Sequence, residues 1–332
     1  MTTTAQRLLA LLVDGTLHSG AQLARELGVT RAAVWKMVGD LRELGVEVGS
    51  VSRRGYRLAR PVELLDASRM REEASLLGRS LPDTLELHFL IDSTNDYLYA
   101  ETPPPHGTPR AVFAEIQRFG RGRRGRRWIA PFGSGLTFSI AWTFAETPAE
   151  LSALGLAMGV AVAAVLGGLG ASDVSLKWPN DVLIGGAKLG GVLTQLRQEA
   201  GGPATIVVGL GLNLALPDAA RRAIDLPGAL PATDLASGIA GELPSRNAIA
   251  ARLLLGMADA LGEFGSRGFA GFAADWGRLD ALRDAPVQVL QGDTRLAGTA
   301  RGADRDGALL LESDGRLLRV FSGDVSVRSG RP

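Results

Sequence analysis

The feature that most restricts how this chain can fold is a stretch of 22 residues, 151–172, without a single charged side chain. A stretch of this length is long enough to cross a lipid bilayer. It is dominated by alanine and glycine, including Gly155, Gly159 and Gly167, and such small residues bury little apolar area each. We therefore expect a buried helix packed closely on a sheet, and not a membrane span. This expectation places an α/β unit in the middle of the chain.

Composition sets broad limits on domains and chemistry. The length of 332 residues suggests two or three domains, and an apolar content of 46% is sufficient for a real core. The net charge of +1 requires any polyanion binding to be local. The lack of cysteine excludes disulfides, thiolate catalysis and cysteine-based zinc sites, and the three scattered histidines form no obvious metal site. No signal-peptide pattern is present, so we expect a cytoplasmic protein without a membrane partner.

The first 62 residues predict a separate winged helix-turn-helix domain. Apolar residues follow helical spacing, and a glycine turn at Gly28 separates the second helix from the third. Two short β-stretches follow and form the wing. The expected elements are helices at 5–12, after Ser19 and at 31–44, and strands at 46–48 and 56–58.

The charge of this domain favours DNA as its partner. Residues 1–60 contain nine Lys and Arg against five Asp and Glu. A helical domain that binds another protein is the alternative. The candidate DNA-binding residues lie on the third helix and the wing tip: Thr30, Arg31, Lys36, Arg42, Arg53 and Arg54.

Residues 65–282 predict a larger mixed α/β domain after a linker that begins at Pro61. The glycine-rich run 209–213 lacks the third glycine of a dinucleotide-binding fingerprint, although close approach of a ligand to its backbone remains possible. Strands are expected at 84–91, 111–116, 136–142 and 205–208, a hairpin of 174–184 and 188–193 around the Gly185-Gly186 turn, a loop at 215–235 and an amphipathic helix at 247–264.

Residues 283–332 predict a third, all-β unit. Turn pairs such as Asp306-Gly307 and Asp314-Gly315 separate short apolar stretches. Four or five short strands in so few residues are typical of a small barrel. The strands are expected at 287–290, 296–301, 308–312, 317–321 and 325–327.

The most unusual polar segment is residues 120–128, in which five arginines and three glycines precede Trp128. Glycine allows a ligand to approach the backbone, and arginine offers a planar, permanent charge that matches carboxylate or phosphate. The segment predicts a cradle for small anions. A solvated basic loop and a non-specific nucleic-acid patch are the alternatives.

A second polar group belongs to the hairpin predicted at 174–193. Lys177, Asn180, Asp181 and Lys188 lie near the ends of its otherwise apolar strands. Charge in such surroundings indicates either a functional site or a structural ion pair between Lys177 and Asp181. The polar run Ser93-Thr94-Asn95 after the first strand is likewise either a ligand site or a plain helix cap.

Together these segments resemble biotin–protein ligases. The resemblance rests on Gln117 with the glycine–arginine run 120–125, on Lys177-Trp178-Pro179-Asn180-Asp181, and on Lys188-Leu189-Gly190-Gly191. It covers nearly the whole chain in the same order. The predicted winged helix and small barrel look like those of the bifunctional members, which also repress the biotin operon. The implied fold is a multidomain α+β protein with a catalytic domain like that of class II synthetases and a C-terminal SH3-like barrel.

The resemblance implies substrates and partners. Biotin and ATP, with Mg²⁺, would form biotinyl-5′-AMP and pyrophosphate. The biotinyl group would then pass to a lysine of the biotin carboxyl carrier protein of acetyl-CoA carboxylase. A homodimer would bind a two-fold operator DNA, and the arginine segment would order over the adenylate and exclude water.

Site residues are implied by the same resemblance. The catalytic residues would be Lys188, Arg123, Arg121 and Asp181. The biotin-binding residues would be Ser93, Thr94, Asn95, Gln117, Gly120, Arg121, Gly122, Arg123, Lys188 and Gly191. The residues that bind ATP or the adenylate would be Arg123, Arg124, Arg126, Lys177, Asn180, Lys188 and Asn213. No protein metal ligands are expected.

Two departures from the family pattern stand out. Asp96 occupies a position where the family often has glutamine. The loop 215–235 has no aromatic residue to cover the adenine, so we expect Ile224 or Leu226 to replace it. The competing hypotheses are a transcription regulator that only senses a ligand, without ligase activity, and a lipoate or octanoyl transferase.

Overall fold

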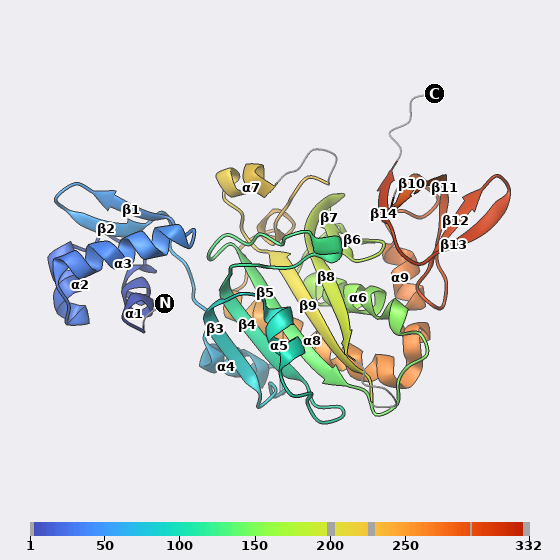
Figure 1. Ribbon diagram of the computed structural model, residues 1–332, viewed down its shortest axis with the longest axis horizontal. Coiled ribbons are helices and arrows are strands. Elements are labelled where there is room, and N and C mark those ends of the chain that lie inside the picture. Colours follow the sequence, from blue (N-terminus) through green and yellow to red (C-terminus); the bar gives the residue numbers. More distant parts are fainter. Residues whose placement is uncertain (1–2, 198–202, 225–229, 293, 328–332) are drawn as a thin grey trace.

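The computed structural model describes residues 3–197, 203–224, 230–292 and 294–327. Figure 1 shows a small N-terminal domain on one side, a large central sheet covered by helices, and a small C-terminal sheet on the other side. These are the three kinds of unit that the sequence predicts.

The N-terminal domain is a three-helix unit with a two-stranded antiparallel wing. Its elements are α1 (Thr3–Leu12), α2 (Gly20–Leu27), α3 (Arg31–Glu43), β1 (Val48–Val51) and β2 (Gly55–Leu58). Ser19 caps α2 and Thr30 caps α3 through side-chain oxygens that accept backbone N–H groups. Gly28 ends α2 in the left-handed conformation, which allows the tight turn into α3.

The central domain is built on a seven-stranded mixed sheet with the order β3-β4-β5-β9-β8-β7-β6. Only β3 and β4 pair in parallel, and every other neighbouring pair is antiparallel. The strands are β3 (Leu85–Ile91), β4 (Arg110–Gln117), β5 (Gly135–Thr143), β6 (Val174–Lys177), β7 (Asp181–Ile184), β8 (Ala187–Arg197) and β9 (Thr205–Asn213).

Helices cover this sheet unequally. The long helices α6 (Leu154–Gly168) and α8 (Arg246–Arg267) pack together on one face, and the short helix α5 (Thr94–Ala100) lies on the other (Figure 1). By length and composition the span Leu151–Gly168 could cross a membrane, yet 61% of it is buried inside the protein. The apolar segment is therefore a core helix, as predicted. The remaining helical elements are α4 (Ala67–Leu76), α7 (Asp218–Ile224), α9 (Ala273–Leu279) and the 3₁₀ turns Arg123–Gly125, Leu151–Ala153, Leu235–Ser237 and Gly268–Gly271.

The predicted position of the first wing strand was wrong, because the strand expected at 46–48 lies at Val48–Val51. Two further local predictions were wrong. The strand expected at 205–208 continues through the glycine run to Asn213, where it pairs with Gly135 of β5. The loop expected at 215–235 contains α7. In the first case pairing on both sides of β9 outweighs the low strand preference of glycine.

The C-terminal unit is a five-stranded antiparallel sheet with the order β13-β12-β11-β10-β14. Its inward-facing aliphatic residues, such as Val287, Leu309 and Val325, join the core of the central domain. The buried Trp178 ties the two units together, because its indole N–H donates to the Gly307 carbonyl at 2.9 Å. The strands are β10 (Pro286–Gln291), β11 (Thr294–Ala303), β12 (Leu309–Ser313), β13 (Arg316–Val320) and β14 (Asp324–Val327).

A buried ion pair anchors the segment that joins the N-terminal and central domains. Arg246, at the start of α8, contacts Glu115 of β4 at 2.6 Å, and both side chains are less than a tenth exposed. Arg246 also donates to the carbonyls of Glu63 and Gly135. Three segments far apart in the sequence therefore meet at one guanidinium group.

Candidate active site

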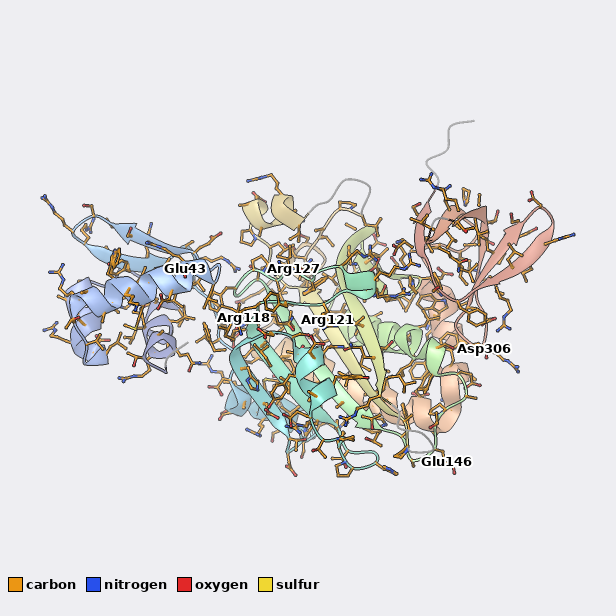
Figure 2. The ribbon with its side chains drawn as sticks, viewed as in Figure 1. Glu43, Arg118, Arg121, Arg127, Glu146 and Asp306 are labelled. Carbon is orange, nitrogen blue, oxygen red and sulfur yellow. The ribbon has the colours of Figure 1, made fainter. Side chains whose placement is uncertain are left out.

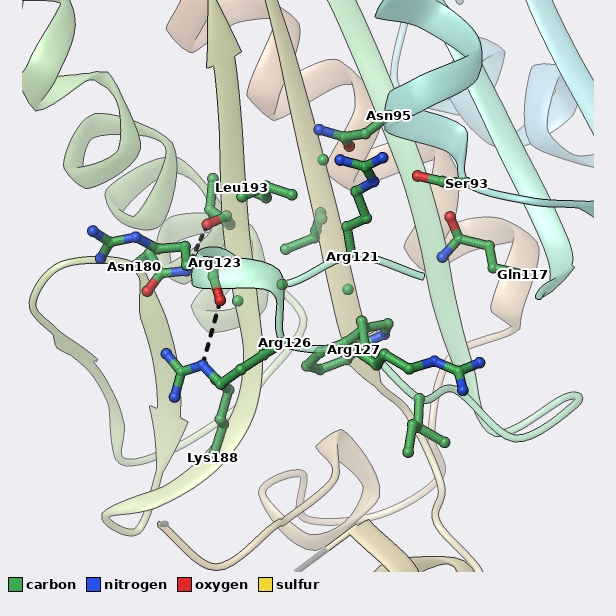
Figure 3. Close-up of a pocket in the computed structure, with 18 of the residues that line it drawn as sticks. Ser93, Asn95, Gln117, Arg121, Arg123, Arg126, Arg127, Asn180, Lys188 and Leu193 are labelled. Carbon is green, nitrogen blue, oxygen red and sulfur yellow. Dashed lines mark hydrogen bonds between the residues drawn. The ribbon is translucent and has the colours of Figure 1, made fainter. Parts of the chain in front are cut away.

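A cavity of about 320 Å³ opens between the arginine segment and the face of the sheet that carries α5. We call it the ligand cavity. Figure 3 shows Ser93 and Gln117 on one side of it and Asn180 and Lys188 on the other, with the arginine segment between them. Twelve residues that the sequence singled out line it: Ser93, Thr94, Asn95, Gln117, Arg121, Gly122, Arg123, Arg126, Asn180, Lys188, Gly191 and Asn213.

Four other candidates lie outside the lining of this cavity, namely Gly120, Arg124, Lys177 and Asp181. Gly120, at the start of the arginine segment, contacts the end of the same segment. Its carbonyl accepts the Trp128 N–H at 2.8 Å, and a Cβ here would stand 2.5 Å from the Trp128 carbonyl oxygen. Gly122 donates its N–H to the Arg126 carbonyl at 2.7 Å. The segment 120–128 is therefore closed on itself, and glycine at position 120 is a steric requirement.

Two strand glycines form the floor of the cavity. A Cβ on Gly211 would lie 2.3 Å from the Trp128 indole, and a Cβ on Gly209 would lie 1.9 Å from Asn95 Oδ1. The indole and the amide thus occupy the space that side chains on β9 would fill. Trp128, Gly209 and Gly211 were missing from the predicted site. The signals for them were the end of the arginine segment, for Trp128, and the glycine run 209–213, for the two glycines. That these two segments meet depends on residues distant in the sequence.

We expect Gly211→Ala to weaken biotin binding by about tenfold or more, because the added methyl forces the Trp128 indole into the cavity. Isothermal titration of biotin would measure this change. Gly167→Ala is the matched control, since Gly167 has open space around its Cβ position. Unchanged biotin affinity in Gly211→Ala would contradict this assignment of the floor.

A buried chain of hydrogen bonds supports one wall of the cavity. The Gln117 amide oxygen accepts the Thr94 N–H at 2.8 Å, and the Thr94 hydroxyl lies 2.7 Å from the Ser139 hydroxyl. Ser139 donates to Asn95 Oδ1 at 2.6 Å, and the Asn95 amide donates to Gln195 at 2.8 Å. Asn95 is thereby engaged on both polar atoms. It holds α5 against β5 and β8, a role that its position after a strand could not reveal.

Positive charge gathers along the arginine segment. Figure 2 shows Arg118, Arg121 and Arg127 on the central domain, between the N-terminal domain and the C-terminal sheet, and in Figure 3 the side chains of Arg121 and Arg127 point in different directions. Arg121 forms an ion pair with Asp96 at 2.7 Å. Burial lowers the pKa of Arg123, although a guanidinium group stays protonated in proteins. A half-buried, charged arginine beside the cavity favours the entry of an anion.

The C-terminal sheet holds the outer side of the arginine segment. Asp324 of β14 pairs with Arg124 at 3.3 Å and with Arg126 at 2.8 Å. Arg124 also donates to the Leu290 carbonyl. Arg124 adopts a left-handed backbone conformation. Its side chain therefore points away from the side chain of Arg123 and toward the C-terminal sheet.

Two lysines share one carboxylate at the hairpin. Lys188 Nζ lies 2.6 Å from Asp181, and Lys177 Nζ lies 3.7 Å from the same group. Lys188 lines the cavity, whereas Lys177 is only 13% exposed and burial lowers its pKa. Asp181 therefore positions Lys188 at the cavity edge. This arrangement contains the structural ion pair predicted between Lys177 and Asp181. It also places Lys188 where it can contact a ligand.

The loop after β9 contributes an aliphatic wall. Ile224, Leu230 and Ala232 line the cavity, while the other candidate, Leu226, lies outside the described residues. Asn213 donates its amide to the Thr233 carbonyl at 3.0 Å, which fixes this loop to the end of β9.

The N-terminal candidates fall into two groups. Thr30 caps α3, and Arg42 donates to the Val48 carbonyl at 2.7 and 2.8 Å, so both have structural contacts. The other four, on α3 and the wing, are exposed: Arg31, Lys36, Arg53 and Arg54.

Comparisons with known proteins agree with this architecture. A biotin/lipoate A/B protein ligase family model matches residues 88–213, a helix-turn-helix domain model matches 4–57, and a biotin protein ligase C-terminal domain model matches 285–328. The "Bifunctional ligase/repressor BirA" of Salmonella typhimurium is 38% identical over 328 residues, covering 99% of this chain and 98% of the relative. The protein of the same name from Escherichia coli is 38% identical over 97% of both chains.

A solved structure gives the same result for the fold. The biotin protein ligase from Aquifex aeolicus in complex with biotin and ATP matches with a TM-score of 0.60 and 27% identity, over 74% of this chain and 99% of that one. The similarity to these relatives extends over nearly the whole chain and includes all three domains in the same order. The chain therefore belongs to the family of bifunctional biotin–protein ligases and repressors.

Proposed function

We propose that this protein forms biotinyl-5′-AMP from biotin and ATP, transfers biotin to a lysine of the carrier protein, and represses transcription as a DNA-bound homodimer. The observation that carries the ligase part is the cavity itself. It joins an apolar floor at Trp128 and Gly211 to a wall with Arg121, Arg123 and Lys188. A molecule with an apolar ring and an anionic end matches both parts.

In the first step a biotin carboxylate oxygen attacks the α-phosphorus of ATP. The bond from this phosphorus to the bridging oxygen breaks, and pyrophosphate leaves with the electron pair. No general base is required, because a carboxylate is already ionised at neutral pH. The chain contributes by holding two anions together and stabilising the charge that develops.

The proposed placement follows the two walls of the cavity. The biotin rings lie on the floor beside Trp128 and Gly211, with Ser93 and Gln117 near their polar end. Arg121 and Arg123 hold the carboxylate and the α-phosphate, and Lys188 lies nearest the developing charge. Asn180 and the aliphatic wall at Ile224 contact the adenylate.

In the second step a carrier lysine amine attacks the acyl carbon, an amide forms, and AMP leaves with the electrons of the acyl–oxygen bond. The amine loses a proton in this step. Asp181 is a nearby carboxylate, and its contacts with Lys188 and Lys177 make it a positioning residue first. A carrier protein carries this lysine on its own surface, so the lysine must enter from the open side of the cavity.

Mg²⁺ would bind at this site in complex with ATP. Within the part of the chain that the structure describes, no three acidic or histidine side chains converge. Mg²⁺ is commonly held by one or two carboxylates together with substrate phosphates and water. Asp181 lies outside the lining of the cavity and already pairs with Lys188 and Lys177, so the ATP phosphates and water would supply most of the metal ligands, and the metal would neutralise phosphate charge.

For the repressor part we propose that α3 enters the major groove of a two-fold operator while Arg53 and Arg54 on the wing contact the backbone. Such a protein works in the cytoplasm. Operator binding that is indifferent to biotin and ATP, in a protein that stays monomeric in sedimentation, would contradict this regulatory model.

The alternatives have less support. A regulator without ligase activity does not explain a cavity with a half-buried arginine and a lysine beside an apolar floor. The Mycobacterium tuberculosis "Biotin--[acetyl-CoA-carboxylase] ligase" is moreover 35% identical over 219 residues. A lipoate transferase is disfavoured because that relative and the similar structure from Aquifex aeolicus are both named as biotin ligases.

Exchange of labelled pyrophosphate into ATP tests the first step without a carrier protein. We expect exchange that depends on biotin and that lipoate does not support. Biotin binding without exchange would favour the sensor hypothesis. No biotin binding would overturn the proposed ligand.

A further inference from the structure

The recognition helix of the N-terminal domain exposes a large aromatic side chain. Trp35 is 69% exposed, whereas its helix neighbours Val34, Met37 and Val38 form the domain core. The core of α3 is complete without Trp35. A tryptophan held in solvent at this position is available for a partner.

Trp35 lies beside a positively charged groove. A cavity of about 510 Å³ separates α3 from the wing, and its lining includes Arg31, Trp35, Arg53 and Arg54. Among the residues that the structure describes, no acidic side chain lines this groove. Arg53 and Arg54 are exposed at the wing tip, and both line this groove together with Arg31 and Trp35 of α3. The charge and shape fit the sugar–phosphate backbone of one DNA strand, with Trp35 at the edge that faces the bases.

The spacing on α3 supports a direct role at the bases. Arg31 and Trp35 are four residues apart, so they lie on one face about 6 Å apart along the helix. This is close to the rise of two base pairs, about 3.4 Å each. Arginine commonly pairs with guanine, and the apolar feature of the major groove is the C5 methyl group of thymine.

We propose that Trp35 recognises thymine in each operator half-site through apolar contact with its C5 methyl group. Arg31 contacts a base one or two steps away, while Lys36, Arg53 and Arg54 contact phosphates. This assignment rests on the proposed repressor function. It goes beyond that function by naming the protein residue and the chemical group of DNA on which the preference for an operator sequence depends.

The test uses the full-length protein with biotin and ATP. Preferred duplexes are first selected from a random pool, and each thymine of the selected site is then replaced by uracil, which removes only the methyl group. We expect one thymine per half-site at which uracil weakens wild-type binding by about fivefold or more. Trp35→Ala should bind thymine and uracil duplexes equally, and Trp35→Phe should restore part of the preference.

Two variants serve as controls. Arg54→Ala should weaken binding to all duplexes alike and reduce its salt dependence, while keeping the thymine preference. Leu76→Ala removes another exposed apolar side chain, 83% exposed and remote from the groove, and should bind DNA normally. Circular dichroism and thermal unfolding check that Trp35→Ala is folded, because pyrophosphate exchange reports on the central domain alone.

Each remaining outcome counts against a specific claim. A selected site without any thymine-to-uracil effect, or an unchanged effect in Trp35→Ala, would overturn the role of Trp35 and leave the repressor function standing. Failure to select any preferred duplex would contradict operator binding itself, and the role of Trp35 with it.

Discussion

Replacing Lys188 by alanine should lower biotin-dependent pyrophosphate exchange by at least about tenfold. Lys188 lines the ligand cavity, and Asp181 holds its ammonium group at 2.6 Å. Loss of one preorganised charge at the reacting phosphate has an effect of this order or larger. Arg123→Ala should show a comparable loss, because Arg123 is a half-buried cation that lines the same cavity.

Lys177→Ala provides the comparison for Lys188. Lys177 approaches the same carboxylate, at 3.7 Å, but does not line the cavity. We expect it to retain more exchange activity than Lys188→Ala. Exchange at the wild-type rate in both Lys188→Ala and Arg123→Ala would overturn the assignment, and equal losses in the two lysine variants would remove the distinction between them.

Replacing Arg246 by alanine should lower the free energy of unfolding by about 3–5 kcal/mol, the usual result of removing one partner of a buried ion pair. Glu115 would remain buried without its partner, and the Gly135 carbonyl would lose two guanidinium donors. Urea denaturation followed by tryptophan fluorescence measures this change, since all the aromatic packing of the central sheet is lost on unfolding.

Arg267→Ala is the matched control on the same helix. Its ion pair with Glu263 is exposed, with side chains 64% and 39% accessible, so its loss should cost less than about 1 kcal/mol. Similar shifts in the denaturation midpoints of Arg246→Ala and Arg267→Ala would contradict the importance given to burial at Arg246.

The chain order of the elements could be predicted because it depends on short-range physics. Apolar periodicity marked α3 and α8, and caps such as Ser19 and Thr30 marked helix starts. The uncharged stretch that became α6 had to be buried as a helix, because its small residues allow close packing on a sheet. The composition of the arginine segment predicted a cradle for anions, and four of its arginines line the ligand cavity.

Errors arose where long-range pairing outweighed local preference. Glycines after position 208 suggested the end of a strand, yet β9 continues because β5 and β8 flank it on both sides. The helix α7 lies in a segment in which prolines indicated only a loop. Local propensity is weak compared with the hydrogen bonds and burial that neighbouring elements supply.

The sequence by itself determined the three units, the polar segments that meet at the site and the family to which the chain belongs. Tertiary structure alone decided which residues of those segments contact one another at the site. It placed Ser139 beneath Asn95, Trp128 over Gly211, and Asp181 between two lysines. The physical reason is the strand order: β5, β9 and β8 are adjacent in space although long segments separate β5 from the other two. Side-chain partners across such a sheet follow from its register, which no local pattern of residues specifies.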